Sequence, residues 1–173
     1  KAYSIFVSAS EDKTCIIWDL NKLSYVRSIE GHTQSVDVVA ISSTSGDIAS
    51  ACRHGLGSCL KLHTINGEEV ASYTSQDHVI NCLAFSTAPE GQSINVVAGG
   101  LDNGVIRIWS TIDLRHLRDL QTENLMLRPV ISITFTFDSQ RLYSSLSDGT
   151  VALWESPTSN KHLLPHKFVA FLG

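Results

Sequence analysis

Four side chains of the type that binds zinc lie within a stretch of twelve residues: Cys52, His54, Cys59 and His63. Cysteine thiolates and histidine nitrogens are ligands that Zn²⁺ prefers in proteins. The spacing C-x-H-x4-C-x3-H, however, fits no common zinc pattern, and His63 ends an apolar run that is typical of a strand. The sequence therefore favours an irregular, glycine-rich turn in this stretch and predicts no metal site.

Two other features could indicate catalysis or cofactor binding, and neither is complete. The stretch GLGS at 55–58 resembles part of a phosphate-binding loop, but a third glycine and a following helix are both missing. Serine, histidine and aspartate are present, but no G-x-S-x-G motif places a serine on a strand-to-helix turn. We therefore predict a protein that is not an enzyme, with no catalytic residues and no cofactor.

The elements that position these side chains repeat along the chain. Four short apolar runs end at Trp18, His63, Trp109 and Trp154, and the intervals between these residues are 45, 46 and 45 positions. A period of about 40–45 residues is typical of the four-stranded blade of a WD-repeat β-propeller. The sequence therefore predicts an all-β fold with about four blades.

Apolar segments bounded by turn residues divide each repeat into strands. First strands are expected at 35–42, 80–86 and 130–136, and second strands at 46–52, 94–100 and 141–147. The segment 111–121 has leucines near helical spacing, but the repeat places a loop and an outer strand there. The predicted blades are a partial one at 1–30, which lacks its inner strand, and others at 31–75, 76–122 and 123–173.

Polar residues recur at fixed places in these repeats. Aspartate or glycine suits the tight turn between the second and third strands, and a Gly-His pair stands where one blade leads into the next. A histidine there can bond to that aspartate, to a serine on the second strand and to the Trp indole on the third. We predict an incomplete structural network formed by Asp12, Trp18, His32, Ser50, His78, Asp102, Trp109, Ser144, Asp148 and Trp154.

The overall composition narrows the class of protein. A formal net charge of -4 gives no basic field that would attract nucleic acid. The four cysteines form no C-x-x-C pair, and we expect them to be reduced and mostly buried, as in the cytoplasm. No apolar run approaches the roughly 18 residues of a membrane span. The chain begins with Lys1 in strand-like sequence, so we expect a fragment of a longer protein.

Several segments resemble one known family. SASEDKTCIIWDLNKL, EGQSINVVAGGLDNGVIRIWSTIDL and SDGTVALW are similar to the carboxyl-terminal WD-repeat propeller of the BEACH-domain proteins, and the likeness covers almost the whole chain. The middle segment favours the branch that regulates lysosome traffic over the FYVE-containing autophagy scaffolds. The resemblance implies a seven-bladed ring, with further blades before this chain, in a large cytoplasmic scaffold peripheral to endosomes and lysosomes. The BEACH domain itself is not in this sequence.

The resemblance implies a platform that docks other proteins and packs on the BEACH domain of its own chain. Two alternatives stay open: a purely architectural propeller that binds nothing else, and a module that binds phosphoinositides or other acidic lipids. The basic region that would bind lipid contains Arg115, His116, Arg118 and Arg128, although we interpret it first as a solvated strand edge. From their position alone, the expected partner-binding residues are Arg53, His54, Asp77 and Arg128.

Overall fold

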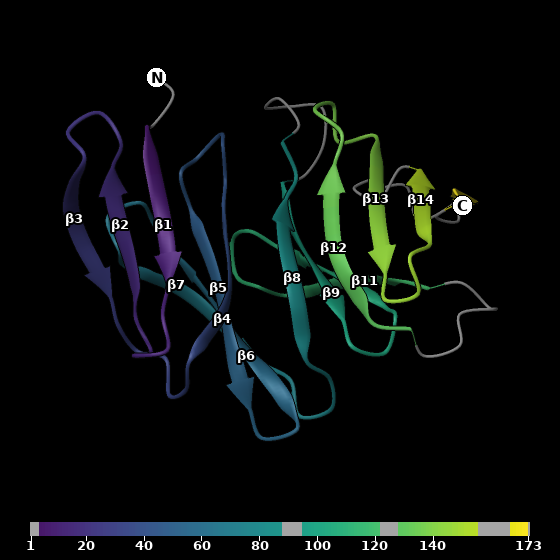
Figure 1. Ribbon diagram of the computed structural model, residues 1–173, viewed down its shortest axis with the longest axis horizontal. Helices are drawn as coiled ribbons and strands as arrows, with labels where there is room; N and C mark the ends of the chain where they lie inside the picture. Colours follow the sequence, from purple (N-terminus) through teal and green to yellow (C-terminus); the bar gives the residue numbers. More distant parts are fainter. Residues whose placement is uncertain (1–3, 88–94, 122–127, 156–166, 173) are drawn as a thin grey trace. The chain divides into compact units, whose positions relative to one another are not determined.

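Every element in the described part of the chain is a β-strand. The computed structural model describes residues 4–87, 95–121, 128–155 and 167–172, and its strands form four antiparallel sheets of three or four strands (Figure 1). Within these ranges there is no helix long and apolar enough to cross a membrane. The predicted all-β fold is confirmed, because sheets of this kind are the blades of WD-repeat propellers.

The chain divides into two compact units, and the first holds two of the sheets. This unit comprises Lys1–Ile80 and Ile112–Leu114. Its sheets are simple meanders in which strands adjacent in sequence are adjacent in space, with the orders β1-β2-β3 and β4-β5-β6-β7. Their strands are β1 (Ile5–Ala9), β2 (Cys15–Asp19), β3 (Ser24–Ile29), β4 (Val36–Ile41), β5 (Ile48–His54), β6 (Gly57–His63) and β7 (Glu69–Thr74).

The second unit holds the other two sheets, which are also meanders. It comprises Asn81–Thr111 and Arg115–Gly173. Its sheets have the orders β8-β9-β10-β11 and β12-β13-β14-β15. Their strands are β8 (Ile80–Phe85), β9 (Val96–Leu101), β10 (Ile106–Ser110), β11 (His116–Leu120), β12 (Val130–Phe135), β13 (Arg141–Leu146), β14 (Val151–Glu155) and β15 (Lys167–Leu172). The segment 111–121 is thus a loop followed by an outer strand, as the repeat predicts.

A β-bulge recurs at the same place in all four sheets. The pairing of the last two strands shifts register between Ile17 and Trp18, and it shifts again immediately before His63, Trp109 and Trp154. These are the residues whose spacing defines the sequence period. A bulge bends and twists the strand that carries it, so each sheet has this irregularity at the same position of the repeat.

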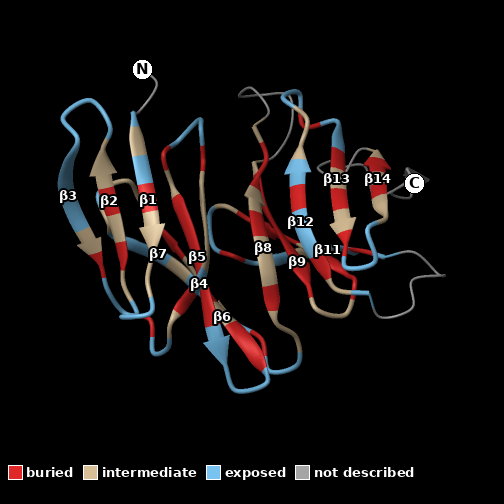
Figure 2. Cartoon of the chain, viewed as in Figure 1, coloured by how far each residue is buried: buried red, intermediate tan, exposed pale blue. Residues whose placement is uncertain are grey.

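Burial follows the strand order within each sheet. The second strands β5 and β9 are buried along most of their length, whereas β3 and β7 are largely exposed (Figure 2). Apolar side chains of the first unit form one cluster that includes Val7, Ile17, Ile29 and Ile48. In the second unit a cluster joins its two sheets through residues such as Ile108 and Trp154. Each unit therefore has its own core.

The expected irregular turn in the second sheet is wrong. Strands β5 and β6 pair without a register shift from Ile48 opposite His63 to His54 opposite Gly57. The hairpin is closed by Gly55 and Leu56, and Gly55 has the positive φ of 60° that a tight turn requires. The stretch GLGS therefore consists of the two turn residues and the first two residues of β6.

Candidate functional site

Aspartates close the turns between second and third strands by bonding to the chain two residues later. The Asp12 carboxylate accepts hydrogen bonds from the backbone N and the hydroxyl of Thr14, at 3.0 and 2.6 Å. Asp148 accepts the same two bonds from Thr150, at 3.0 and 2.7 Å. These bonds hold the pKa of both carboxyls below their ordinary values. Both aspartates are thus built into turns.

The third sheet places this turn residue one position later than we expected. Asn103 accepts the bond from Val105 N at 3.1 Å. It therefore takes the place that Asp12 and Asp148 have in their own turns, and sequence reasoning had assigned that place to Asp102. A role for Asp102 and for His78 in the network stays a prediction.

Two of the three tryptophans donate a hydrogen bond to a serine on the neighbouring second strand. Trp18 Nε1 donates to Ser8 Oγ at 3.0 Å, and Trp154 Nε1 donates to Ser144 Oγ at 3.2 Å. The latter pair is buried, with both side chains 1% exposed. In the third sheet Gly99 stands at the position of these serines, beside the buried Trp109.

The second sheet replaces this arrangement with histidines. His63 lies at the tryptophan position, opposite Ile48, and Ser50 is bonded instead to His32, whose Nε2 lies 2.8 Å from Ser50 Oγ. Burial, with help from the nearby Lys61 and His63, lowers the pKa of His32 to about 4, so its imidazole is neutral at pH 7. Burial also lowers the pKa of His63. Two neutral, buried imidazoles therefore occupy one face of this sheet.

Beside them lies one ion pair. Lys61 Nζ is 2.6 Å from Glu69 Oε2 across the pairing of β6 with β7. The hydrogen bond from Lys61 is the main reason why the pKa of Glu69 is lowered. The pair balances its own charge, so it leaves no net charge next to His32.

Three of the four expected partner-binding residues lie at one end of this same sheet. Arg53 and His54 end β5 and are exposed, and Asp77 is exposed in the loop between β7 and β8. This loop is tied to the hairpin, because Ser75 N donates to Ser58 O at 2.8 Å and Ile80 N donates to the buried Ser58 Oγ at 3.0 Å. The exposed side chains therefore stand on a loop pair with a fixed backbone.

The fourth expected residue, Arg128, lies in the other unit, in the segment that leads into β12. Its guanidinium forms an ion pair with Asp148. Its backbone carbonyl lies against Gly104, where an added Cβ would come within 2.9 Å of that oxygen. Pro129 O accepts a hydrogen bond from Ser147 N at 2.9 Å. Arg128 is thus exposed but already paired.

Two members of the basic region expected to bind lipid, His116 and Arg128, lie beside a carboxylate. Arg107 donates two hydrogen bonds of 2.9 Å to the carboxylate of Asp119. His116 Nε2 lies 2.9 Å from the same carboxylate. Arg115 and Arg118 also have interaction partners. The region lies on and beside the outer strand β11, and its pairing favours a solvated strand edge over a lipid site.

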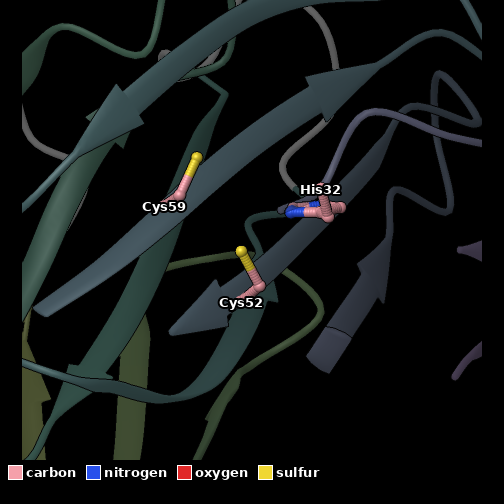
Figure 3. Close-up of side chains that lie close together, drawn as sticks. All are labelled: His32, Cys52 and Cys59. Atoms are coloured by element: carbon pink, nitrogen blue, oxygen red, sulfur yellow. The ribbon is translucent and has the colours of Figure 1, made fainter. Parts of the chain in front are cut away.

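The structure brings together a cysteine–histidine group that differs from the one seen in the sequence. His32, Cys52 and Cys59 each offer a ligand atom, and the three atoms lie within 4.8 Å of one another (Figure 3). His54 is exposed and is not part of this group. Sequence reasoning missed His32 because it is far from the cysteines in sequence. The signal was nevertheless present, since Cys52 follows Ser50 by two residues and shares its face of the strand.

Comparison with known proteins agrees with this architecture. The family model described as "WD domain, G-beta repeat" matches residues 2–19 and 126–155. The human lysosomal-trafficking regulator is 51% identical over 155 residues, which are 89% of this chain and 4% of that protein. The mouse WD repeat- and FYVE domain-containing protein 4 is 35% identical over 65% of this chain and 4% of its own length.

A plant relative extends the same pattern. BEACH domain-containing protein A2 of Arabidopsis thaliana is 28% identical over 90% of this chain and 5% of its own length. The chain thus spans only about one twentieth of the length of each of these three relatives. With its four antiparallel sheets and its repeated tryptophan positions, the chain is a WD-repeat segment of the BEACH family, similar to the lysosomal-trafficking regulator.

Proposed function

We propose that this chain is a non-catalytic module for protein–protein interaction in a cytoplasmic, BEACH-family regulator of lysosome and endosome membrane traffic. The observation that carries the proposal is the loop pair at the end of the second sheet. Exposed side chains of both charge signs, Arg53 and Asp77, stand there on a backbone that is fixed by hydrogen bonds. WD-repeat relatives that are named for trafficking support the choice of process.

A fixed backbone matters for docking because binding otherwise includes the entropic cost of ordering the loop. In this loop pair the backbone is already ordered by the bonds that Ser58 makes to Ser75 and Ile80. The cost of ordering is then limited to the side chains of Arg53, His54 and Asp77. A partner segment with an acidic group and a basic group at matching positions would complement this surface.

The experiment compares partner capture by the full-length protein with capture by a triple variant, R53A/H54A/D77A. We expect proximity labelling of neighbouring proteins to lose a defined subset of partners in the variant, because the three side chains are exposed and their removal leaves the sheet intact. The matched control is N66A/E68A, which alters exposed residues in the turn joining β6 to β7, at the opposite end of the sheet.

Each outcome has a plain meaning. Loss of the same partners in both variants would indicate a folding defect instead of a docking surface. An unchanged set of partners in the triple variant would overturn the proposal and favour an architectural role, in which the segment only packs on the BEACH domain of its own chain. Arg128 is tested in a separate R128A variant, because its removal also breaks the ion pair with Asp148.

A further inference from the structure

The second sheet departs from the others at its hairpin. In the first and fourth sheets the hairpin positions hold Thr14 and Thr150, which lie four residues before the tryptophan and bond to an aspartate. Four residues before His63 the second sheet has Cys59, and directly opposite it lies Cys52. The polar turn network is therefore replaced by two thiols.

His32 completes this group from a different segment. Its side chain is 6% exposed, and it lies in the loop before β4. One ring nitrogen, Nε2, is bonded to Ser50, whereas the buried Nδ1 has no hydrogen-bond partner in the described residues. A buried nitrogen without a partner is costly, and native proteins seldom leave one. The ring therefore has one buried nitrogen whose lone pair or proton is unused, and one of its two nitrogens lies within 4.8 Å of both sulfurs.

The distances suit a thiophilic metal ion. With Zn–S bonds of about 2.3 Å, two sulfurs in a tetrahedral site are about 3.8 Å apart. The three potential ligand atoms already lie within 4.8 Å of one another. A shift of about 1 Å or less, well within the range of side-chain rotation, would bring them around one ion. Figure 3 shows the side chains of His32, Cys52 and Cys59 close together.

Charge balance selects a divalent ion. Two thiolates and a neutral imidazole carry two negative charges, which Zn²⁺ cancels, and a buried site with no net charge avoids a large desolvation cost. The adjacent pair of Lys61 and Glu69 is itself balanced. Binding would replace the two thiol protons by the ion and release both protons to water. In the described residues no fourth histidine, cysteine or carboxylate joins the group, so water would fill the last position.

We propose that His32, Cys52 and Cys59 form a binding site for a single Zn²⁺ ion, which stabilises the second sheet at its hairpin. The site is independent of the proposed docking function, because none of its three residues belongs to the exposed loop pair. It also differs from the zinc pattern that the sequence suggested, since it excludes His54 and takes His32 instead.

The test measures metal binding by the chain itself, purified in a phosphine reductant. We expect one zinc ion per chain by elemental mass spectrometry, and Co²⁺ added to the zinc-free chain should give the ultraviolet charge-transfer band of thiolate ligands. Variants C52S and C59S should each weaken zinc binding by at least about tenfold. Zinc should also raise the thermal midpoint of the unaltered chain but not that of C52S.

Matched controls separate the site from general thiol and histidine effects. C82S removes a half-buried cysteine from the other unit, and H54A removes the exposed histidine next to the hairpin; both should bind zinc as the unaltered chain does. Circular dichroism checks that each variant is folded. The proposal fails if the reduced, folded chain retains no zinc while both thiols react freely with a thiol reagent. It also fails if C52S and C59S bind zinc as tightly as C82S does.

Discussion

Equivalent positions of the repeat lie at the same place in each sheet, but the side chains at these positions form different hydrogen bonds. In the first and fourth sheets a serine on the second strand accepts a hydrogen bond from the indole N–H of Trp18 or Trp154. In the second sheet the serine at the same position, Ser50, is bonded to His32 instead. The hydroxyl is used in each case because the position is partly or fully closed to water. Where water is excluded, a polar group needs a protein partner, and the identity of that partner can vary.

The burial of each tryptophan–serine hydrogen bond should decide how much that bond contributes to the free energy of unfolding. We expect S144A to lower the free energy of unfolding by about 1–3 kcal/mol, because it leaves the buried Trp154 N–H without its acceptor. The equivalent change S8A should cost less, since Trp18 is only half-buried and water can replace Ser8. Urea unfolding followed by tryptophan fluorescence measures both. Equal losses would show that burial of the indole does not set the cost.

The aspartate turns predict a dependence of stability on pH. The hydrogen bonds from Thr14 to Asp12 lower the pKa of this carboxyl below its ordinary value of 3.8. The folded state therefore binds fewer protons than the unfolded chain near that pH. The resulting stability is fully present above the unfolded pKa and is lost as the pH falls through the folded pKa.

The measurement compares urea midpoints of the unaltered chain and D12N between about pH 6 and about pH 2. We expect D12N to be the less stable protein at the upper end of this range and to approach the unaltered chain at the lower end. E11Q removes a charge from the same turn and serves as the control. If D12N and E11Q change the profile equally, net charge and not the Thr14 bonds is the cause.

Some of these residue roles could be predicted from the sequence and others could not. The period of the sequence repeat identifies the positions of four residues, because turn and strand positions recur at a constant interval: Trp18, Trp154, Asp12 and Asp148. The exchange of Asp102 for Asn103 was missed because both residues suit a turn, and only the bond to Val105 distinguishes them. The approach of His32 to the cysteines was missed because the zinc pattern was sought within one short stretch, although Ser50, the predicted partner of His32, shares a strand face with Cys52.

At the scale of elements, the hairpin of β5 and β6 sets the geometry of the loop pair that we propose as the docking surface. Gly57 begins β6 against the loop that follows β7, and a Cβ added there would come within 2.1 Å of the Ser75 carbonyl oxygen. The obstacle is backbone, which cannot rotate away as a side chain can. Glycine at this position therefore allows the hairpin and the loop to lie in direct contact.

Replacing this glycine should be costly. We expect G57A to lower the free energy of unfolding by about 3 kcal/mol or more, at the upper end of the cost of overpacking, because the loop at Ser75 must move. G55A in the same hairpin is the matched control: an added Cβ there meets nothing within 4 Å, and only its positive φ opposes the change, at about 1 kcal/mol. Chemical denaturation gives both values. A cost for G57A no larger than that for G55A would contradict the close contact.

The same hairpin shows where element prediction fails. Strand boundaries follow from apolar runs, and those of the four sheets lie close to the predicted segments. The turn at 55–56 was misjudged because two cysteines and two glycines were taken as signs of irregularity, whereas the strands simply continue for two more residue pairs. The repeated bulge before each tryptophan position could not be predicted from the residue types, because a bulge depends on how two strands pair and not on the sequence of either strand alone.

At the scale of the whole molecule, several charged side chains of the described residues are paired with a neighbour of opposite sign. The chain has 13 basic and 17 acidic residues, and the arginines nearest the suspected lipid site are bonded to Asp119 and Asp148. A cation that is already paired attracts an anionic surface less strongly, since its partner repels that surface.

Because Arg107 and Arg128 are paired with carboxylates, we expect that the chain does not bind acidic membranes. In flotation with vesicles rich in phosphatidylserine or phosphoinositide, we expect the unaltered chain to stay in the aqueous fraction even at low salt, where surface attraction is strongest. A double variant, D119N/D148N, releases Arg107 and Arg128 from their partners and reduces the net charge from -4 to -2, the loss of two negative charges. If pairing is what prevents binding, the variant should float more than the unaltered chain. Flotation of the unaltered chain that is abolished by salt would instead establish a direct lipid contact.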